Sequence, residues 1–231
     1  MKSQGIKRQS IYEQVIEHLK ESIIARSLQP GDRLPTEAAL AEELGVSRLS
    51  IREAIKVMES WGIVQTRPGD GSRLGTCTMQ PLADHLRFLY DLDGVTLPEM
   101  ATARRVLEIS LLPLVVQEAT EVDFLRMEEA NAALREMTAK EQSAASEDME
   151  FHLALASAAH NRALEGFSRV LHEFFDTISR THRFDEAQWK TIEEHGHLIQ
   201  ALRDRDLDRA QEVLIEHLRV YEEPESQTSV E

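Results

Sequence analysis

Four polar residues in the C-terminal half lie at positions that otherwise belong to apolar helix faces. They are Asp148, His152, His195 and His217. Asp148 and His152 are four residues apart and share a face with Phe151 and Leu155. Buried polar groups need partners, and imidazole and carboxylate are ligands of divalent cations. One metal ion held from three helices would satisfy all four, although any of these histidines alone is more often an ordinary core or surface residue.

A fifth inward polar residue is Arg104, which shares a helical face with Met100 and Leu111. A buried guanidinium requires a carboxylate or phosphate partner. Two interpretations remain open at this point. The partner is either a bound anion or an internal acid such as Asp148 or Glu108.

These residues belong to a region of long helical stretches with no alternating strand pattern and no repeat of fixed period. The stretches are 97–119, 121–139, 144–159, 162–181, 186–204 and 206–222. Only 10 Gly and 7 Pro punctuate the 231 residues. An antiparallel all-α helical bundle is therefore expected for residues 96–222, followed by a disordered polar tail at 223–231.

The N-terminal region has shorter elements. A first amphipathic helix is expected over 11–26, and Pro-Gly ends it. Thr36 can cap a second helix that ends at Gly45, and Ser47 can cap a third that ends at Gly62. Two short helices joined in this way are typical of a helix-turn-helix.

The third helix carries cations on its polar face. Arg48, Arg52 and Lys56 recur at intervals of four residues. A cation in the first turn opposes the helix dipole, so Arg48 is better explained as a contact to phosphate or a guanine edge. The alternative is a solvated face with pairs such as Arg52–Glu53 or Lys56–Glu59. The segments IVQT and SRLG then flank the sequence RPGDG and indicate a small β-hairpin, a wing.

Charge separates the two regions and bounds the class of protein. The net charge is -15, yet residues 1–75 carry 11 Lys and Arg against 10 acidic residues. Residues 76–231 carry 15 against 31, so only the first region can approach a polyanion. The single Cys77, the absence of an apolar leader and the absence of a membrane-length apolar run predict a cytoplasmic protein with no membrane partner.

The segments IYEQVIEHLKESI, PGDRLPTE, GVSR, REA and RPGDGSRL resemble the winged helix-turn-helix of the GntR family of bacterial transcription regulators. The resemblance spans about residues 10–75 without a gap. It implies that Arg48 and Arg52 contact operator DNA and that Gly69 at the wing tip enters the minor groove. It also implies that Ser47 and Ser50 approach the backbone or base edges.

Two positions depart from the family pattern. Ala38 follows PTE where many members have an arginine or another polar residue, and Leu49 replaces the commoner threonine. Both departures concern which operator sequence is bound, and neither removes the expectation of DNA binding.

The C-terminal segments TARRVLE, DMEFHLALASAAHN and EEHGHLIQALRDRDLDRAQEVLIEHL resemble the FCD effector domain of the FadR subfamily. The resemblance implies that the Asp148 and histidine set holds Zn, Ni or another divalent ion such as Mn. It further implies that a small organic acid binds beside the metal, that Arg104 meets its carboxylate and that Asn161 lines the pocket. By residue type alone, Asn161 is most simply the N-cap of the following helix.

Together these features predict a mainly α chain whose winged helix-turn-helix occupies 1–76 and is followed by a linker with a short helix at 77–95. The effector-binding and dimerisation domain would occupy 96–222. We expect a non-enzymatic, homodimeric, DNA-binding regulator, with repression relieved by a small carboxylate. A divalent-metal sensor is the alternative. A helical metalloenzyme is disfavoured because the chain has no HExxH and because the helical di-metal pattern needs two Glu-x-x-His pairs, where only Glu194–His197 fits.

Overall fold

The computed structural model describes residues 10–76, 78–179 and 188–219. The chain divides into two compact units, residues 1–82 and 83–231, and each is described by itself. The tail predicted at 223–231, and the helix ends expected at 181, 186 and 222, lie outside the described residues.

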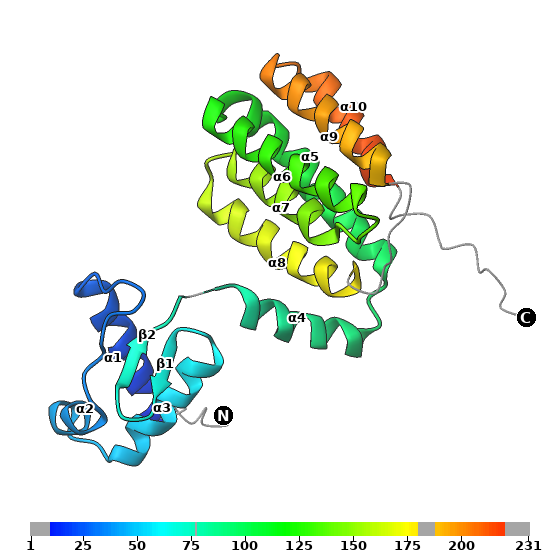
Figure 1. The fold of residues 1–231 in the computed structure, drawn as a ribbon. Coiled ribbons are helices and arrows are strands. Elements are labelled where there is room, and N and C mark those ends of the chain that lie inside the picture. Colours follow the sequence, from blue (N-terminus) through cyan, green and yellow to red (C-terminus); the bar gives the residue numbers. More distant parts are fainter. Residues whose placement is uncertain (1–9, 77, 180–187, 220–231) are drawn as a thin grey trace, which may run out of the picture. The chain divides into compact units, whose positions relative to one another are not determined.

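The N-terminal unit consists of three helices and a two-stranded antiparallel hairpin (Figure 1). The elements are α1 (Ile11–Ala25), α2 (Glu37–Leu44), α3 (Arg48–Ser60), β1 (Val64–Arg67) and β2 (Gly71–Leu74). Strand pairing runs from Val64 opposite Leu74 to Arg67 opposite Gly71. The buried face of α3, which includes Ile51 and Met58, packs against α1 and α2.

Caps fix where these helices begin and end. The Thr36 hydroxyl accepts from the amide of Ala39, and α2 ends at Gly45 in the left-handed conformation, φ 65°. The Ser47 hydroxyl accepts from the amide of Ser50 and starts α3. The caps therefore place Arg48 in the first turn of α3, as the sequence predicts.

Residues 31–34 run beside β2 and tie the loop after α1 to the hairpin. The amide of Gly31 donates to the carbonyl of Leu74 at 2.8 Å, and the amide of Leu34 donates to Ser72 at 2.9 Å. In return, the amide of Leu74 donates to Asp32 at 2.8 Å. Strand β2 is thus bonded on both sides, by β1 and by residues 31–34, so the hairpin does not stand alone.

The C-terminal unit is a helical bundle (Figure 1). Its helices are α4 (Gln80–Asp93), α5 (Leu97–Glu118), α6 (Glu121–Ala139), α7 (Ala145–Ser157), α8 (Arg162–Ser179), α9 (Gln188–Arg203) and α10 (Leu207–Leu218). The helix α4 crosses the division between the units. Helix α6 packs on α7 and α9, and α10 packs on α9 and α5. The mainly α fold with an N-terminal winged helix-turn-helix is confirmed.

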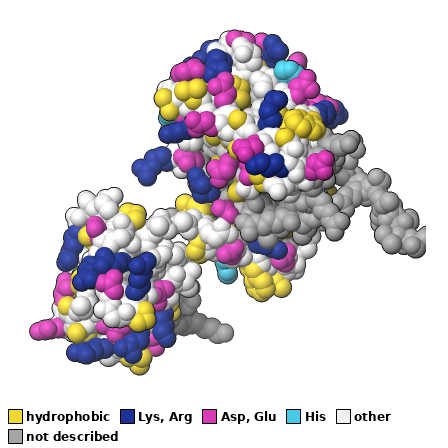
Figure 2. Space-filling model, in the orientation of Figure 1, with side chains coloured by type: hydrophobic (Ala, Val, Ile, Leu, Met, Phe, Trp, Pro, Cys, Tyr) yellow, Lys and Arg dark blue, Asp and Glu magenta, His cyan; other side chains and the backbone are white. Residues whose placement is uncertain are grey.

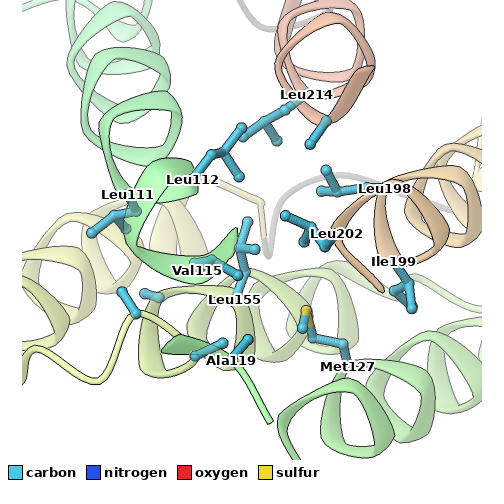
Figure 3. Packing of buried hydrophobic residues seen from close by; sticks show 14 of the residues in the cluster. Leu111, Leu112, Val115, Ala119, Met127, Leu155, Leu198, Ile199, Leu202 and Leu214 are labelled. Carbon is cyan, nitrogen blue, oxygen red and sulfur yellow. The ribbon is translucent and has the colours of Figure 1, made fainter. Parts of the chain in front are cut away.

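One apolar core holds this bundle together. Residues from α5, α6, α7, α9 and α10 meet in it (Figure 3). The members include Leu111, Leu112, Val115, Met127, Leu155, Leu198, Leu202 and Leu214. Phe151 belongs to the same core and stacks on His195 with 3.5 Å between ring centroids, so the candidate metal residues adjoin the core.

An arginine ties the α9–α10 turn to the end of α5. The Arg205 guanidinium donates to the carbonyls of Val115 at 3.3 Å and Ala119 at 2.7 Å, and to that of Val116. These carbonyls lie at the C-terminal end of α5, where helix bonding leaves acceptors unsatisfied. Among the described residues, no helix is long and apolar enough to cross a bilayer.

Leu155→Ala should lower the free energy of unfolding by about 2–5 kcal/mol, because it removes a fully buried side chain from the core. Denaturant unfolding followed by far-UV circular dichroism measures this. Leu125→Ala is the matched control, since Leu125 is 49% exposed, and its effect should stay within about 0.5 kcal/mol. Equal effects of the two substitutions would contradict the assignment of the core.

Candidate metal centre and nucleic-acid interface

The structure brings the four candidate metal ligands together in one cluster. Asp148 and His152 come from α7, His195 from α9 and His217 from α10. Nε2 of His217 lies 3.1 Å from Nε2 of His152 and 3.3 Å from Nε2 of His195. One potential ligand atom from each of the four residues lies within 4.8 Å of the others, and the three histidines are buried.

The other ring nitrogen of each histidine faces an oxygen atom. The Nδ1 pairs are Glu108–His152 at 2.6 Å, Asn131–His195 at 3.3 Å and Glu194–His217 at 2.9 Å. A carboxylate can only accept, so His152 and His217 carry their proton on Nδ1. Asn131 donates its amide to the carbonyl of Ile192 at 3.0 Å, which leaves its oxygen to accept from His195.

The consequence is that three Nε2 lone pairs point toward one another. Neutral imidazoles arranged in this way repel unless a cation lies among them. Burial lowers the pKa of His152 to about 4 and lowers that of His195 well below its usual range. Both rings are therefore neutral near pH 7, and the neutral imidazole is the form that binds metal.

Asp148 supplies the fourth potential ligand atom. Its Oδ1 is buried and has no hydrogen-bond partner among the described residues; it lies 3.5 Å from Nε2 of His195 and 3.8 Å from Nε2 of His152. A buried carboxylate oxygen with no donor is costly. Three imidazole nitrogens and one carboxylate oxygen form a donor set suited to a divalent ion, so these residues fit a metal.

Arg104 is buried and bonded to internal acids. Its Nε donates to Oε1 of Glu108 at 2.8 Å, and its Nη2 lies 3.8 Å from Oδ2 of Asp148. The sequence left a bound anion and an internal acid open as partners of Arg104. The structure contains the second, because Arg104 forms an ion pair with Glu108. Burial would raise the pKa of Glu108, yet the adjacent His152 imidazole and the Arg104 guanidinium hold it well below the usual range.

Glu108 also meets a fourth buried histidine. Nε2 of His172 on α8 lies 3.1 Å from Oε1 of Glu108, and its Nδ1 donates to the carbonyl of Ser168 at 2.7 Å. Glu108, His152 and His172 form a second group of potential ligands. The Arg104 guanidinium is bonded to the carboxylate of Glu108, and its positive charge disfavours a metal ion at this second group. Glu108 is therefore better explained as the acceptor that orients His152.

The described bonds of Asn161 are those of a helix cap. Its exposed side chain accepts from the amides of Ala163 at 3.1 Å and Leu164 at 3.2 Å and starts α8. Its role in an effector pocket stays a prediction.

Sequence reasoning missed three members of this site. Helical spacing places Glu194 with His197 on the polar side of α9, and this is wrong because the Glu194 side chain is only 14% exposed and reaches His217. Asn131 gave no signal, since an asparagine in a helix has many explanations. His172 lies beside the apolar stripe of Leu171, where helical spacing alone does not decide its orientation, and it is buried.

The N-terminal unit presents its cations on the surface. Figure 2 shows Lys and Arg side chains gathered over the visible face of this unit. Arg48, Arg52 and Lys56 of α3 are all exposed. Arg52 pairs with Glu37 of α2, through Nη2 at 2.8 Å and Nε at 3.3 Å. The pair Arg52–Glu53, expected if this were simply a solvated face, is not the one formed. The hydrogen bond from Arg52 lowers the pKa of Glu37.

The serines and the wing complete this face. The hydroxyls of Ser47 and Ser50 lie 3.0 Å apart at the start of α3. Gly69 is exposed with φ 81°, a conformation that favours glycine. Beside it, Asp70 accepts from Arg73 and pairs with Arg33, which fastens the wing tip to the loop after α1. Helix α3 and the wing are arranged as in winged helix-turn-helix domains.

Comparisons with known proteins agree for both units. Residues 11–74 match the family described as bacterial regulatory proteins, gntR family, and residues 99–220 match the FCD domain. The solved structure of Streptococcus agalactiae GntR superposes with a TM-score of 0.74 at 25% identity, covering 90% of this chain and 97% of that chain.

Two curated relatives illustrate the similarity along the sequence. The Uxu operon regulator of Haemophilus influenzae is 28% identical and covers 90% of this chain and 79% of its own length. The Glc operon transcriptional activator of Escherichia coli is 27% identical, and the match covers 92% of this chain and 87% of that protein.

Glu37→Gln should lower the ratio of specific to non-specific DNA affinity by about two- to fivefold, the scale of an exposed ion pair. Arg52 loses its charged partner and its fixed orientation, while loss of an acid strengthens sequence-independent binding. Anisotropy titrations with a selected and a scrambled duplex at two salt concentrations measure this ratio. In the control Glu53→Gln, specific and non-specific binding should rise together, so the ratio should stay unchanged. A ratio that falls equally in both variants would contradict the role of Glu37.

Glu194→Gln should weaken Zn²⁺ binding by about tenfold or more, because the Gln amide is a weaker acceptor for the Nδ1 proton of His217. Competition with a chromophoric chelator measures the affinity. Glu193→Gln is the matched control, since Glu193 is the exposed neighbour on the same helix. Unchanged zinc affinity in Glu194→Gln would count against the orientation of His217 by Glu194.

Proposed function

The chain belongs to the GntR family of bacterial regulatory proteins and is a DNA-binding transcription regulator with an FCD domain, and we propose that this domain senses a small organic acid through a bound divalent metal. The observation that carries the proposal is the convergence of three imidazole Nε2 atoms and a donorless carboxylate oxygen. Asp148, His152, His195 and His217 would hold the ion. Zn²⁺ is the first expectation from this nitrogen-rich set, with Ni²⁺ and Mn²⁺ as alternatives.

Charge around the cluster supports an anionic effector. Asp148 and Glu108 contribute two negative charges and Arg104 one positive charge, while Lys190 offsets Glu194 at 3.1 Å. A divalent ion would therefore leave one positive charge in excess. A carboxylate matches that excess, and the metal, when bound, offers it a Lewis-acidic partner. Arg104 would be its second contact through the guanidinium beside Asp148.

On the DNA side, the exposed face of α3 and the wing tip are the proposed contacts. Arg48, Arg52 and Lys56 would meet phosphates or guanine edges, with Ser47 and Ser50 at the start of the helix. Gly69 would let the wing approach the minor groove. A homodimer would place two such units on the half-sites of a palindromic operator.

The proposed regulation requires different affinities in two states. The effector would bind one arrangement of the dimer more tightly, and that arrangement would bind the operator less well. Repression relieved by ligand is the expected sign. One relative is named as an activator, so the opposite sign is the alternative. Expression of a reporter gene placed behind the operator decides between repression and activation.

A metal sensor is the second candidate, and one observation favours it. The protein itself supplies four potential ligand atoms, which can complete a tetrahedral site without any effector. In that case metal alone would change operator affinity. The relatives named above are regulators, which favours a non-enzymatic role for this chain.

A thermal-shift screen of small carboxylates against zinc-loaded protein tests the proposal. A ligand at about a hundred times its dissociation constant adds roughly 2.7 kcal/mol of stability. We expect a carboxylate that stabilises the wild type only when zinc is present. Its affinity should fall about tenfold or more in Arg104→Lys, which keeps the charge but loses the planar fork. Arg126→Lys is the control, since that arginine is mostly exposed.

The double variant His152→Ala with His217→Ala separates the alternatives. It should lose stoichiometric zinc and, with it, the carboxylate response. Retention of both would overturn the metal site. Release of operator by zinc alone, with no carboxylate response, would replace the acid sensor by the metal sensor.

A further inference from the structure

A large apolar side chain lies on the polar face of α3, in the first turn of the helix. Leu49, the second residue of the helix, is 64% exposed. The buried residues of α3 are Ile51, Ala54, Ile55 and Met58. Leu49 lies on the opposite side, because Arg52 and Lys56, three and seven residues further along, share its face and are exposed.

Exposure alone is weak evidence, since single exposed leucines are common on protein surfaces. The place of Leu49 gives it meaning. It lies in the first turn, between Arg48 and Ser50, and a recognition helix contacts base edges with its N-terminal residues. Arg52, one turn further along, is drawn toward α2 by its bonds to Glu37 at 2.8 and 3.3 Å. Leu49 therefore lies at the N-terminal end of the exposed face of α3, on the side of the helix away from its buried residues.

The chemistry of the major groove narrows what this side chain can meet. Every base edge there presents hydrogen-bond donors or acceptors, and thymine alone adds an apolar group, the C5-methyl. A leucine neither donates nor accepts, so covering a polar edge with it leaves that edge unsatisfied. Covering a methyl group removes apolar surface of both partners from water.

We propose that Leu49 reads a thymine in each operator half-site through its C5-methyl group. The inference rests on the proposed use of α3 for DNA contacts and adds a base preference to it. Arg48 and the serines hydrogen-bond their targets, whereas Leu49 selects by apolar contact and rejects positions that offer polar atoms alone.

The test starts by selecting duplexes from a random pool with the full-length protein. Each thymine of the selected duplex is then replaced singly by deoxyuridine, which removes the methyl group and keeps base pairing and O4. Dissociation constants are measured by fluorescence anisotropy for the wild type and Leu49→Ser. Ile24→Ser serves as a matched control, because Ile24 is 77% exposed on α1 of the same unit. Both substitutions lie on the surface, so thermal unfolding should be unchanged.

In the wild type and in Ile24→Ser, we expect one thymine per half-site whose replacement weakens binding about fourfold, the scale of one buried methyl group. Leu49→Ser should bind the thymine and deoxyuridine duplexes equally. Absence of any methyl-sensitive thymine in the wild type, or the same sensitivity in Leu49→Ser, overturns the inference. If Arg52→Ala still weakens binding in that case, DNA contact by α3 stands and only the role of Leu49 fails. If the wild type selects no duplex, the proposed DNA contacts fail with it.

Discussion

The orientation of three imidazole rings is the constraint on which the C-terminal unit depends. Each ring is fixed by an oxygen on its outer nitrogen, from Glu108, Asn131 or Glu194. With the protons held on that side, the inner nitrogens converge on Asp148. Ligands and orienting groups come from α5, α6, α7, α9 and α10. The same five helices form the apolar core, so the packing of that core also determines the alignment of the site. The buried charge of Arg104 beside Glu108 belongs to the same arrangement.

In the N-terminal unit, too, polar partners orient the side chains of a candidate site. Its exposed cationic face, formed by α3 and the wing, is built on capped helix ends, and polar contacts hold its cations in place. Glu37 fixes Arg52, and Asp70 joins Arg33 to Arg73. These pairs are exposed, so each contributes little to stability. Their effect is to set the direction of side chains that would otherwise sample many rotamers before meeting a partner.

Much of this could be predicted from local spacing. Helix caps at Thr36 and Ser47 follow from residue type, and the four-residue interval places Asp148 and His152 on one face. The fold class followed from periodicity. The groups that orient the site did not, because Glu108 and His152 are 44 residues apart and Asn131 and His195 are 64 apart. Such pairs depend on how helices pack, and nothing in a single helical pattern specifies the neighbour. Glu37 and Arg52 escaped prediction for the same reason.

The contacts of Arg205 have a mechanical consequence. They fasten the turn between α9 and α10 to the end of α5, while His217 lies near the far end of α10 and His195 near the middle of α9. The turn is thus a fixed point of the hairpin, and each imidazole lies about 15 Å from it along its helix, at 1.5 Å per residue. A tilt of roughly 4° about the turn would move a ring by about 1 Å at that distance. Metal ligation tolerates only about 0.2 Å. An ion among the rings would therefore fix the hairpin at a second place, so that it is held both at its turn and at its two ligand positions.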